Sequence, residues 1–186
     1  MAKSFWINSN FFVDCLIISC HIFPDMGLFD KLMETFSDAP QWKGKRFENY
    51  ILDKFDERYF TVVEQTHSYQ TNEKRFVESS NNPDYVLRYN PSRQEFAVEC
   101  KYRSHLTNKM LDVCKLHQLD RYREFAMKRK IPVYLVVGLG GVDDFPDDLF
   151  VIPLEQMKYP SLYPSIFSQF SKNPNNNFYW KNGKLT

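Results

Sequence analysis

An aspartate, a glutamate and a lysine near the middle of the chain are the residues best suited to carry chemistry. Asp84 follows a proline, and Glu99 and Lys101 flank a single cysteine further along. Two carboxylates that meet in space bind a hard divalent cation such as Mg²⁺ through their oxygens. A cation held in this way lowers the pKa of a bound water molecule. The chemistry indicated by this set is therefore metal-assisted hydrolysis.

A predicted β-hairpin brings these residues together. Alternating apolar residues indicate strands at Tyr85–Tyr89 and Glu95–Tyr102, and Asn90–Arg93 has the composition of a turn. With either a two-residue turn or a four-residue loop in that segment, the pairing places Asp84 directly opposite Glu99. The Cβ atoms of directly opposed residues lie about 4.5–5.5 Å apart. The two carboxylates are therefore expected to meet.

The predicted hairpin has one apolar face and one charged face. Glu99 and Lys101 share a face because side chains alternate along a strand. Like charges directly opposite each other destabilise a sheet, so a bound cation would compensate, with the carbonyl oxygen of Cys100 as a further ligand. The structural alternative is a solvated hairpin face on which Lys101 offsets the carboxylates without a metal.

A polar residue interrupts the apolar face of a long helix predicted over Leu106–Lys130. Residues spaced three or four apart fall on one face of a helix. In this segment they are Leu111, Cys114, Gln118, Tyr122 and Phe125. A buried amide needs a hydrogen-bond partner. For Gln118 the candidates are a metal-bound carboxylate, a substrate phosphate or, in the structural alternative, a backbone carbonyl.

A second helix, predicted over Lys43–Arg58, carries another carboxylate at the edge of its apolar face. Gly44 and Glu48 lie one turn apart on this helix. Because glycine has no side chain, a substrate or another backbone could approach closely beside the Glu48 carboxylate. Glu48 is thus a candidate ligand of the same metal or of its outer shell. In the structural alternative Glu48 pairs with Lys45 or Lys54.

The remaining patterns complete an α/β fold. Strand after helix after strand is typical of a sheet with helices on its faces, and the almost wholly apolar Val133–Val137 is expected at the centre of that sheet. The further predicted elements are a short helix at Gly27–Phe36, strands at Phe60–Glu64 and Leu149–Ile152, a helix at Ser161–Phe170 and an edge strand at Phe178–Trp180.

Composition limits the class of protein. The chain has 186 residues, a net charge of +1 and four cysteines, which are Cys15, Cys20, Cys100 and Cys114. Their spacing fits neither a zinc site nor an iron–sulfur cluster, and Cys100 and Cys114 are expected to be buried thiols. A reducing, cytoplasmic setting follows. No small-molecule cofactor is indicated.

The first part of the chain stands apart from the rest. The apolar stretch Phe11–Phe23 is interrupted by Asp14 and His21, and it is too short to span a bilayer. We expect an N-terminal extension at 1–25 and a single domain at 26–186. A membrane role through residues 1–25 is disfavoured.

The ordered motifs of the chain resemble the PD-(D/E)xK nuclease superfamily. Pro83-Asp84 resembles its PD element, and Glu99-Cys-Lys101 resembles its ExK element. The segments Gly44–Glu48 and Gln118–Tyr122 resemble the GxxxE and QxxxY elements of RecB-like members. The resemblance spans Gly44 to Tyr122 and implies a restriction-endonuclease-like core, in which a mixed central sheet is flanked by helices.

The resemblance also implies roles for individual residues. Asp84 and Glu99 would bind Mg²⁺, for which Mn²⁺ can substitute, with Glu48 as a first- or second-shell ligand. Lys101 would hold a water molecule or stabilise charge on the phosphate, and Gln118 would orient the nucleophile or a phosphate. Contacts to the backbone of DNA are assigned to Tyr122, Lys43, Lys45, Arg103 and Arg121.

Three functions remain open at this point. The first is a Mg²⁺-dependent deoxyribonuclease. The second is a catalytically inactive module on the same fold that binds nucleic acid or a partner. The third is a membrane-associated protein anchored by residues 1–25. The sequence leaves open whether the chain forms a homodimer.

Overall fold

Six strands form a central sheet in the order β1-β2-β3-β5-β6-β8. The structure is a computed structural model that describes residues 40–66 and 82–186. Strands β3 and β5 run parallel, whereas the other neighbours are antiparallel, so the expected mixed sheet is confirmed. The strands are β1 (Phe60–Gln65), β2 (Tyr85–Tyr89), β3 (Gln94–Arg103), β5 (Val133–Leu139), β6 (Asp148–Pro153) and β8 (Ser171–Lys172).

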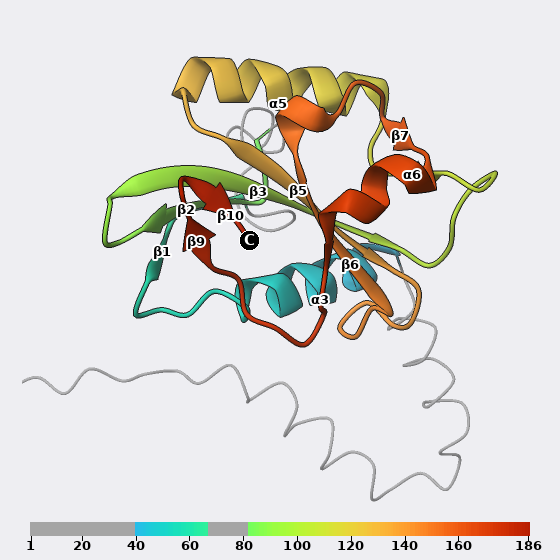
Figure 1. The fold of residues 1–186 in the computed structure, drawn as a ribbon, viewed down its shortest axis with the longest axis horizontal. Helices are drawn as coiled ribbons and strands as arrows, with labels where there is room; N and C mark the ends of the chain where they lie inside the picture. Colours follow the sequence, from blue (N-terminus) through green and yellow to red (C-terminus); the bar gives the residue numbers. More distant parts are fainter. Residues whose placement is uncertain (1–39, 67–81) are drawn as a thin grey trace, which may run out of the picture. The chain divides into compact units, whose positions relative to one another are not determined.

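Two helices, α3 (Pro40–Leu52) and α5 (Leu116–Arg129), cover opposite faces of the sheet, as Figure 1 shows. Phe47 of α3 packs in one apolar cluster with Val98, whereas the apolar side of α5 packs in a second cluster with Ala97. Adjacent residues of a strand point to opposite faces, so β3 contributes alternately to both clusters. This explains why Ala97 and Val98 are both fully buried although they point to opposite faces.

The pairing of β2 with β3 follows the predicted register. Tyr85 pairs with Val98, and Tyr89 pairs with Gln94. The loop Asn90–Arg93 therefore has four residues, as in one of the two predicted arrangements. Arg93 takes a positive φ of 56°, which lets the chain reverse over a short distance. Continued by one residue, this register sets Asp84 against Glu99.

The segment before α5 differs from the prediction. The predicted helix starts at Leu106, but α5 begins at Leu116. Asn108 and Lys109 both adopt left-handed backbone with φ of 51° and 63°, and they form the tip of a tight hairpin that no right-handed helix can contain. Leu111 then pairs with Leu162 in a small two-stranded sheet. The helical stripe predicted from Leu111 is therefore wrong in its first part.

Two further boundaries differ from the prediction. Helix α3 ends at Leu52 instead of Arg58, because the chain turns there to enter β1. The predicted helix Ser161–Phe170 is a short strand followed by one α-helical turn and one 3-10 turn. The small elements are β4 (Leu111–Asp112), η1 (Leu154–Gln156), β7 (Ser161–Leu162), α6 (Pro164–Phe167), η2 (Ser168–Phe170), β9 (Trp180–Lys181) and β10 (Lys184–Leu185).

Polar contacts from the middle and the last turn of helix α3 attach it to the rest of the fold. Arg46 donates to both carboxylate oxygens of the buried Asp143, with Nε–Oδ2 and Nη2–Oδ1 distances of 2.5 Å and 3.1 Å. The Tyr50 hydroxyl donates to the carbonyl oxygen of Pro174 at 2.6 Å. A fork of two charge-assisted hydrogen bonds fixes orientation as well as distance. These contacts hold the helix that carries Glu48 in place.

The predictions for the N-terminal part fall outside the described residues. This applies to the helix at Gly27–Phe36 and to the boundary between 1–25 and 26–186. The described residues from Pro40 to Thr186 form one compact unit. None of the helices that the structure describes is both long and apolar enough to span a membrane.

Candidate functional site

The candidate site lies where β3 extends past the start of β2. Pairing between the two strands stops at Tyr85 and Val98, whereas β3 continues beside β5 as far as Arg103. Asp84 lies immediately before β2, and its Oδ2 atom accepts the backbone N–H of Cys100 at 2.7 Å. A side chain thus takes the place of the missing backbone partner. The Asp84 carboxylate is held at the edge of β3.

The backbone carbonyl of Cys100 lies at the same edge. Along a strand, the N–H and C=O groups of one residue point to the same side, and successive residues alternate. The N–H of Ala97 donates towards β5, to the carbonyl oxygen of Pro132, whereas the N–H of Cys100 points to Asp84. The carbonyl oxygen of Cys100 is therefore directed to the Asp84 side. Its role as a further metal ligand stays a prediction.

Glu99 is the best-fixed side chain of the site. It is 4% exposed, and its Oε1 atom accepts the hydroxyl of Tyr122 at 2.7 Å. The same oxygen forms an ion pair with the ammonium group of Lys101. Glu99, Lys101 and Asp84 therefore meet as the sequence predicts. The contact with α5 comes through Tyr122.

Burial and neighbouring charges shift the pKa values of Asp84 and Lys101. Burial raises the pKa of Asp84 well above its usual value, and the charges of Glu99 and Glu48 raise it further, against the opposing effects of Lys101 and the Cys100 N–H. Burial lowers the pKa of Lys101, but Glu99 and Asp84 outweigh this effect and the pKa is raised overall. Lys101 is therefore cationic, and it faces more carboxylates than it can neutralise.

The donor set fits an open magnesium site. Among the described residues, no group of three or more histidine, cysteine or acidic side chains is arranged to enclose a metal ion. Mg²⁺ does not need such a group, because it usually keeps several waters and binds through one or two carboxylates. Asp84 and Glu99 provide two carboxylates, and Cys100 provides a carbonyl oxygen beside them.

Glu48 agrees with both of its interpretations. It pairs with Lys45, with an Nζ–Oε2 distance of 3.0 Å, as the structural alternative predicted. Its charge also raises the pKa of Asp84, so Glu48 lies close enough to influence the site. The structure brings it near the three central residues from α3. Its role as a metal ligand stays a prediction.

Gln118 makes a different contact from those considered for it. Its Oε1 atom accepts the backbone N–H of Lys115 at 2.9 Å, at the start of α5. The first N–H groups of a helix have no partner inside it, and this amide oxygen satisfies one that precedes α5. Within the described part of the chain, this is the side-chain hydrogen bond that Gln118 makes. Its role in orienting a nucleophile stays a prediction.

The basic residues assigned to DNA differ in what they contact. Arg103 donates to the carbonyl oxygens of Asp112, Tyr102 and Val113 at 2.5–2.8 Å, so its guanidinium group fastens the hairpin that follows β3. Lys45 is paired with Glu48. Lys43 on α3 and Arg121 on α5 are both half-buried. Contacts of these four residues with DNA stay predictions, and the placement of Arg103 favours a structural role.

Tyr122 contacts the carboxylate site directly, whereas the sequence assigned it to the nucleic acid. Its hydroxyl is buried against Glu99, and burial and the Glu99 charge raise its pKa, so it remains a hydrogen-bond donor. The sequence placed Tyr122 four residues after Gln118, on the apolar face of the helix, and this position indicated a buried side chain. The pattern alone did not identify Glu99 as its partner.

Tyr122→Phe is expected to destabilise the fold by about 1.5–3 kcal/mol, the usual contribution of a hydrogen bond to a charged group. Freed from this contact, Glu99 should also bind a cation less tightly. We expect the Mg²⁺ concentration for half-maximal binding to rise about 10-fold, as for other groups that orient metal ligands. Thermal unfolding and calorimetric Mg²⁺ titration measure the two effects. Unchanged Mg²⁺ affinity in a folded variant would show that Tyr122 is structural only.

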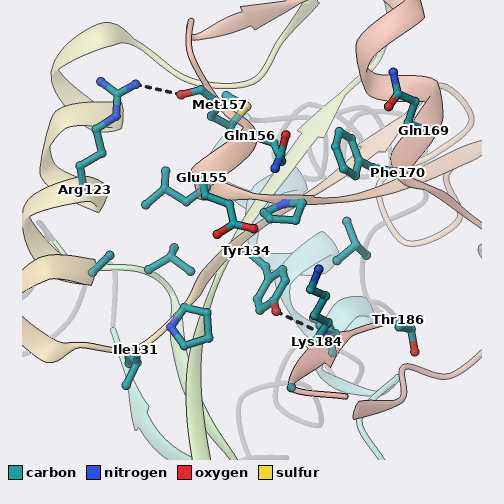
Figure 2. Close-up of a pocket in the computed structure, with 18 of the residues that line it drawn as sticks. Arg123, Ile131, Tyr134, Glu155, Gln156, Met157, Gln169, Phe170, Lys184 and Thr186 are labelled. Carbon is teal, nitrogen blue, oxygen red and sulfur yellow. Dashed lines mark hydrogen bonds between the residues drawn. The ribbon is translucent and has the colours of Figure 1, made fainter. Parts of the chain in front are cut away.

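A groove of about 940 Å³ lies elsewhere in the fold, between the end of α5 and the β9–β10 hairpin. Figure 2 shows residues that line it. On one side Arg123 donates to the carbonyl oxygen of Met157 at 2.8 Å. On the other, the Tyr134 hydroxyl accepts the N–H of Leu185 at 3.2 Å. None of the site residues predicted from the sequence lines this groove. It is therefore separate from the carboxylate site.

Comparison with known proteins finds similarity in solved structures but none in sequence. No protein-family model and no curated protein sequence matches the chain. Among solved structures, the chain is similar to Hjc, a Holliday junction resolvase from the archaeal hyperthermophile Archaeoglobus fulgidus, with a TM-score of 0.49 and 17% sequence identity. The likeness covers 68% of this chain and 93% of that chain. It assigns no role to any residue.

Proposed function

We propose that this protein is a metal-dependent nuclease that hydrolyses phosphodiester bonds in DNA, with Mg²⁺ as its cofactor. The observation that carries the proposal is the meeting of Asp84, Glu99 and Lys101 at the open edge of β3. Buried carboxylates that repel each other cost stability. Their presence together, with a lysine and two oriented hydrogen-bond donors, is best explained by a ligand that they bind.

The residues would hold the cation as follows. The carboxylates of Asp84 and Glu99 and the carbonyl oxygen of Cys100 are the candidate ligands, and Glu48 is an outer-shell partner. Mn²⁺ prefers the same oxygen ligands as Mg²⁺ and should substitute for it. When bound, the metal lowers the pKa of a water molecule and offsets the charge of the scissile phosphate.

The chain's own groups have distinct roles in this proposal. Lys101 carries a positive charge that Glu99 and Asp84 maintain, and it would stabilise negative charge that develops on the phosphate. Tyr122 keeps one oxygen of Glu99 in a fixed position. The Cys100 N–H does the same for Asp84. Lys43, Lys45 and Arg121 are the candidates for contacts to the DNA backbone, which contribute affinity without reading sequence.

A second candidate is a non-catalytic module that binds nucleic acid or a partner on this fold. Two ion pairs favour it, because Lys101 already contacts Glu99 and Lys45 already contacts Glu48. Such pairs could satisfy the site without a metal. Calorimetric titration with Mg²⁺ separates the candidates, since only the nuclease needs the carboxylates to bind a divalent cation.

A cleavage panel tests the proposed function. Linear duplex, circular duplex, single-stranded and branched DNA, together with RNA, are incubated with the full chain in Mg²⁺, in Mn²⁺ and in EDTA. We expect cleavage of DNA that requires a divalent cation. Activity that persists in EDTA would overturn the metal-dependent mechanism. No cleavage of any substrate, combined with no binding of Mg²⁺, would leave the binding module as the function.

A further inference from the structure

An aromatic pocket of about 420 Å³ lies at the end of β2 that is remote from Asp84. Aromatic residues make up most of its lining, and they come from the approach to β1, the end of β2 and the segment leading into β9. They are Tyr59, Phe60, Tyr89, Phe178, Tyr179 and Trp180. No part of the mechanism proposed above uses them.

Hydrogen bonds hold the three segments of this pocket together. The N–H of Asn90 donates to the carbonyl oxygen of Tyr59 at 2.8 Å, and the N–H of Phe178 donates to that of Lys54 at 3.0 Å. The indole N–H of Trp180 donates to Oε1 of Gln94 at 2.9 Å. The pocket is therefore built from backbone and side chains that are already fixed before any ligand binds.

The floor and the rim of the pocket differ in exposure. Phe60 and Phe178 are buried and both pack against Phe55, with ring centroids 5.1 Å and 5.0 Å apart. Tyr59 is 46% exposed and Tyr179 is 64% exposed. Packing in the core thus accounts for the aromatic side chains of Phe60 and Phe178. The two tyrosine rings at the rim are not, and exposed aromatic rings of this kind are common at binding sites.

The chemistry of the pocket fits a flat ring attached to a negatively charged chain. Arg58 lies over the ring of Tyr59 at 5.7 Å from its centroid, and its side chain is 79% exposed. Arg93 and Lys181 are exposed beside Gln94 and Trp180. Arg58 is paired with Asp56, with an Nη2–Oδ2 distance of 2.6 Å, so the two exposed cations Arg93 and Lys181 stand against one further acid, Glu57. A cationic ligand is disfavoured, whereas a phosphate backbone is attracted.

We propose that this pocket binds an unpaired nucleobase of the substrate by stacking it against Tyr59 and Tyr179. The inference rests on the proposed function for the identity of the ligand as DNA. Every base has a π-face, so aromatic side chains bind single strands with little dependence on sequence. A base in a duplex is already stacked between its neighbours. The pocket therefore selects DNA with a single-stranded segment.

The position of the pocket sets the length of strand that can reach it. From Asp84 to Tyr89 the chain advances about 17 Å, at about 3.4 Å per residue of an antiparallel strand. A DNA strand rises by about 3.4 Å per nucleotide when stacked. Glu99 faces α5, whereas Phe60 and Phe178 belong to the apolar cluster under α3, so this distance is a lower bound. The stacked base would thus lie at least about five nucleotides from the scissile phosphate. Shorter single strands should reach the carboxylates without reaching the pocket.

Binding measured without cleavage tests this inference. The full chain carrying Lys101→Ala is kept in EDTA, and fluorescence anisotropy gives the Kd for a labelled oligothymidylate of about 12 nucleotides, within the usual range of single-strand sites. Adding Tyr59→Leu and Tyr179→Leu together should weaken this Kd by about 10–100-fold. The Kd for a duplex of equal length should not change. Both residues lie at the surface, so the variants should fold, which thermal unfolding checks.

Two matched variants sharpen the test. Tyr59→Phe with Tyr179→Phe keeps both rings and should keep the affinity for the oligonucleotide. Tyr159→Leu removes an exposed tyrosine outside the pocket and should also have no effect. The inference is overturned if the leucine pair has the same Kd for the oligonucleotide as the parent. It is also overturned if the phenylalanine pair loses as much affinity for the oligonucleotide as the leucine pair, or if the leucine pair loses as much affinity for the duplex.

The outcomes separate this inference from the proposed function. If the wild-type chain cleaves DNA but the leucine pair binds normally, the nuclease stands and the stacking site is wrong. If the leucine pair loses single-strand binding but no cleavage occurs with any metal, the stacking site stands and the nuclease is wrong. A peptide or another planar ligand in the pocket would give normal oligonucleotide binding in all variants, and this also overturns the inference.

Discussion

Lys101→Ala is expected to reduce Mg²⁺-dependent cleavage by at least about 100-fold while the protein remains folded. The loss of a preorganised positive group near developing negative charge typically has an effect of about 100–1000-fold. Lys101 is held against Glu99 and has a pKa raised by Glu99 and Asp84. Initial rates of DNA cleavage at saturating Mg²⁺ measure the effect.

A matched lysine controls for the loss of charge. Lys128 is exposed on α5, and Lys128→Ala removes the same charge from a helix that tolerates alanine well. This variant should retain the wild-type cleavage rate. If Lys101→Ala is fully folded and cleaves DNA at the wild-type rate, Lys101 has no role in the reaction.

Asp84→Asn is expected to abolish cleavage and to stabilise the metal-free fold. The amide keeps an oxygen to accept the Cys100 N–H, but it removes a buried charge that faces Glu99 and Glu48. We expect a gain of about 0.5–2 kcal/mol in the free energy of unfolding, which is the usual size of a stabilising substitution at a functional site. The loss of a metal ligand should lower activity by at least about 100-fold.

The pH dependence of this gain has a defined sign. The pKa of Asp84 is raised in the folded protein, so the folded state binds a proton more tightly than the unfolded state does. The stability that Asp84 contributes is therefore present below its unfolded pKa and is lost as the pH rises through the folded pKa. Asparagine does not titrate, so the advantage of Asp84→Asn over wild type should grow with rising pH.

Denaturant unfolding in EDTA at several pH values measures this advantage. Added Mg²⁺ should stabilise the wild type and leave Asp84→Asn unchanged, because only a ligand that binds the folded state shifts the unfolding equilibrium. Asp144→Asn, at an exposed loop position, should behave as wild type. A variant that is less stable than wild type at alkaline pH would contradict the electrostatic account of the site.

The hairpin could be predicted from sequence because local rules determine it. Alternation in Tyr85–Tyr89 and Glu95–Tyr102 fixes which face each residue occupies, and a slip by one residue would move every side chain to the opposite face. The turn Asn90–Arg93 then fixes the register. The proximity of Asp84 and Glu99 follows from these two constraints.

The start of α5 could not be predicted in the same way. Leu111 and Cys114 continue the spacing of the helix face by coincidence, because a short strand and a loop happen to place apolar residues at similar intervals. The left-handed conformations of Asn108 and Lys109 interrupt the helix. Lysine rarely adopts that conformation, so no local signal marked the second of these positions.

Contacts between segments that are distant in the sequence also could not be predicted. The partner of Tyr122 became visible only when α5 was placed over β3. The aromatic pocket joins Tyr59, Tyr89 and Tyr179, which lie in three separate parts of the chain. Each is unremarkable in its own segment. Only the tertiary fold shows that they share one surface.

The polar contacts of α3 have a consequence for folding during synthesis. Its polar contacts go to Asp143 and Pro174, which are synthesised long after α3 itself. A nascent chain grows at about 5–20 residues per second. Asp143 and Pro174 are therefore added several seconds or more after α3 has been synthesised. Glu48 can therefore be fixed near Asp84 only after Asp143 and Pro174 have left the ribosome. A nascent chain that stops short of Pro174 would lack a fixed position for this third carboxylate.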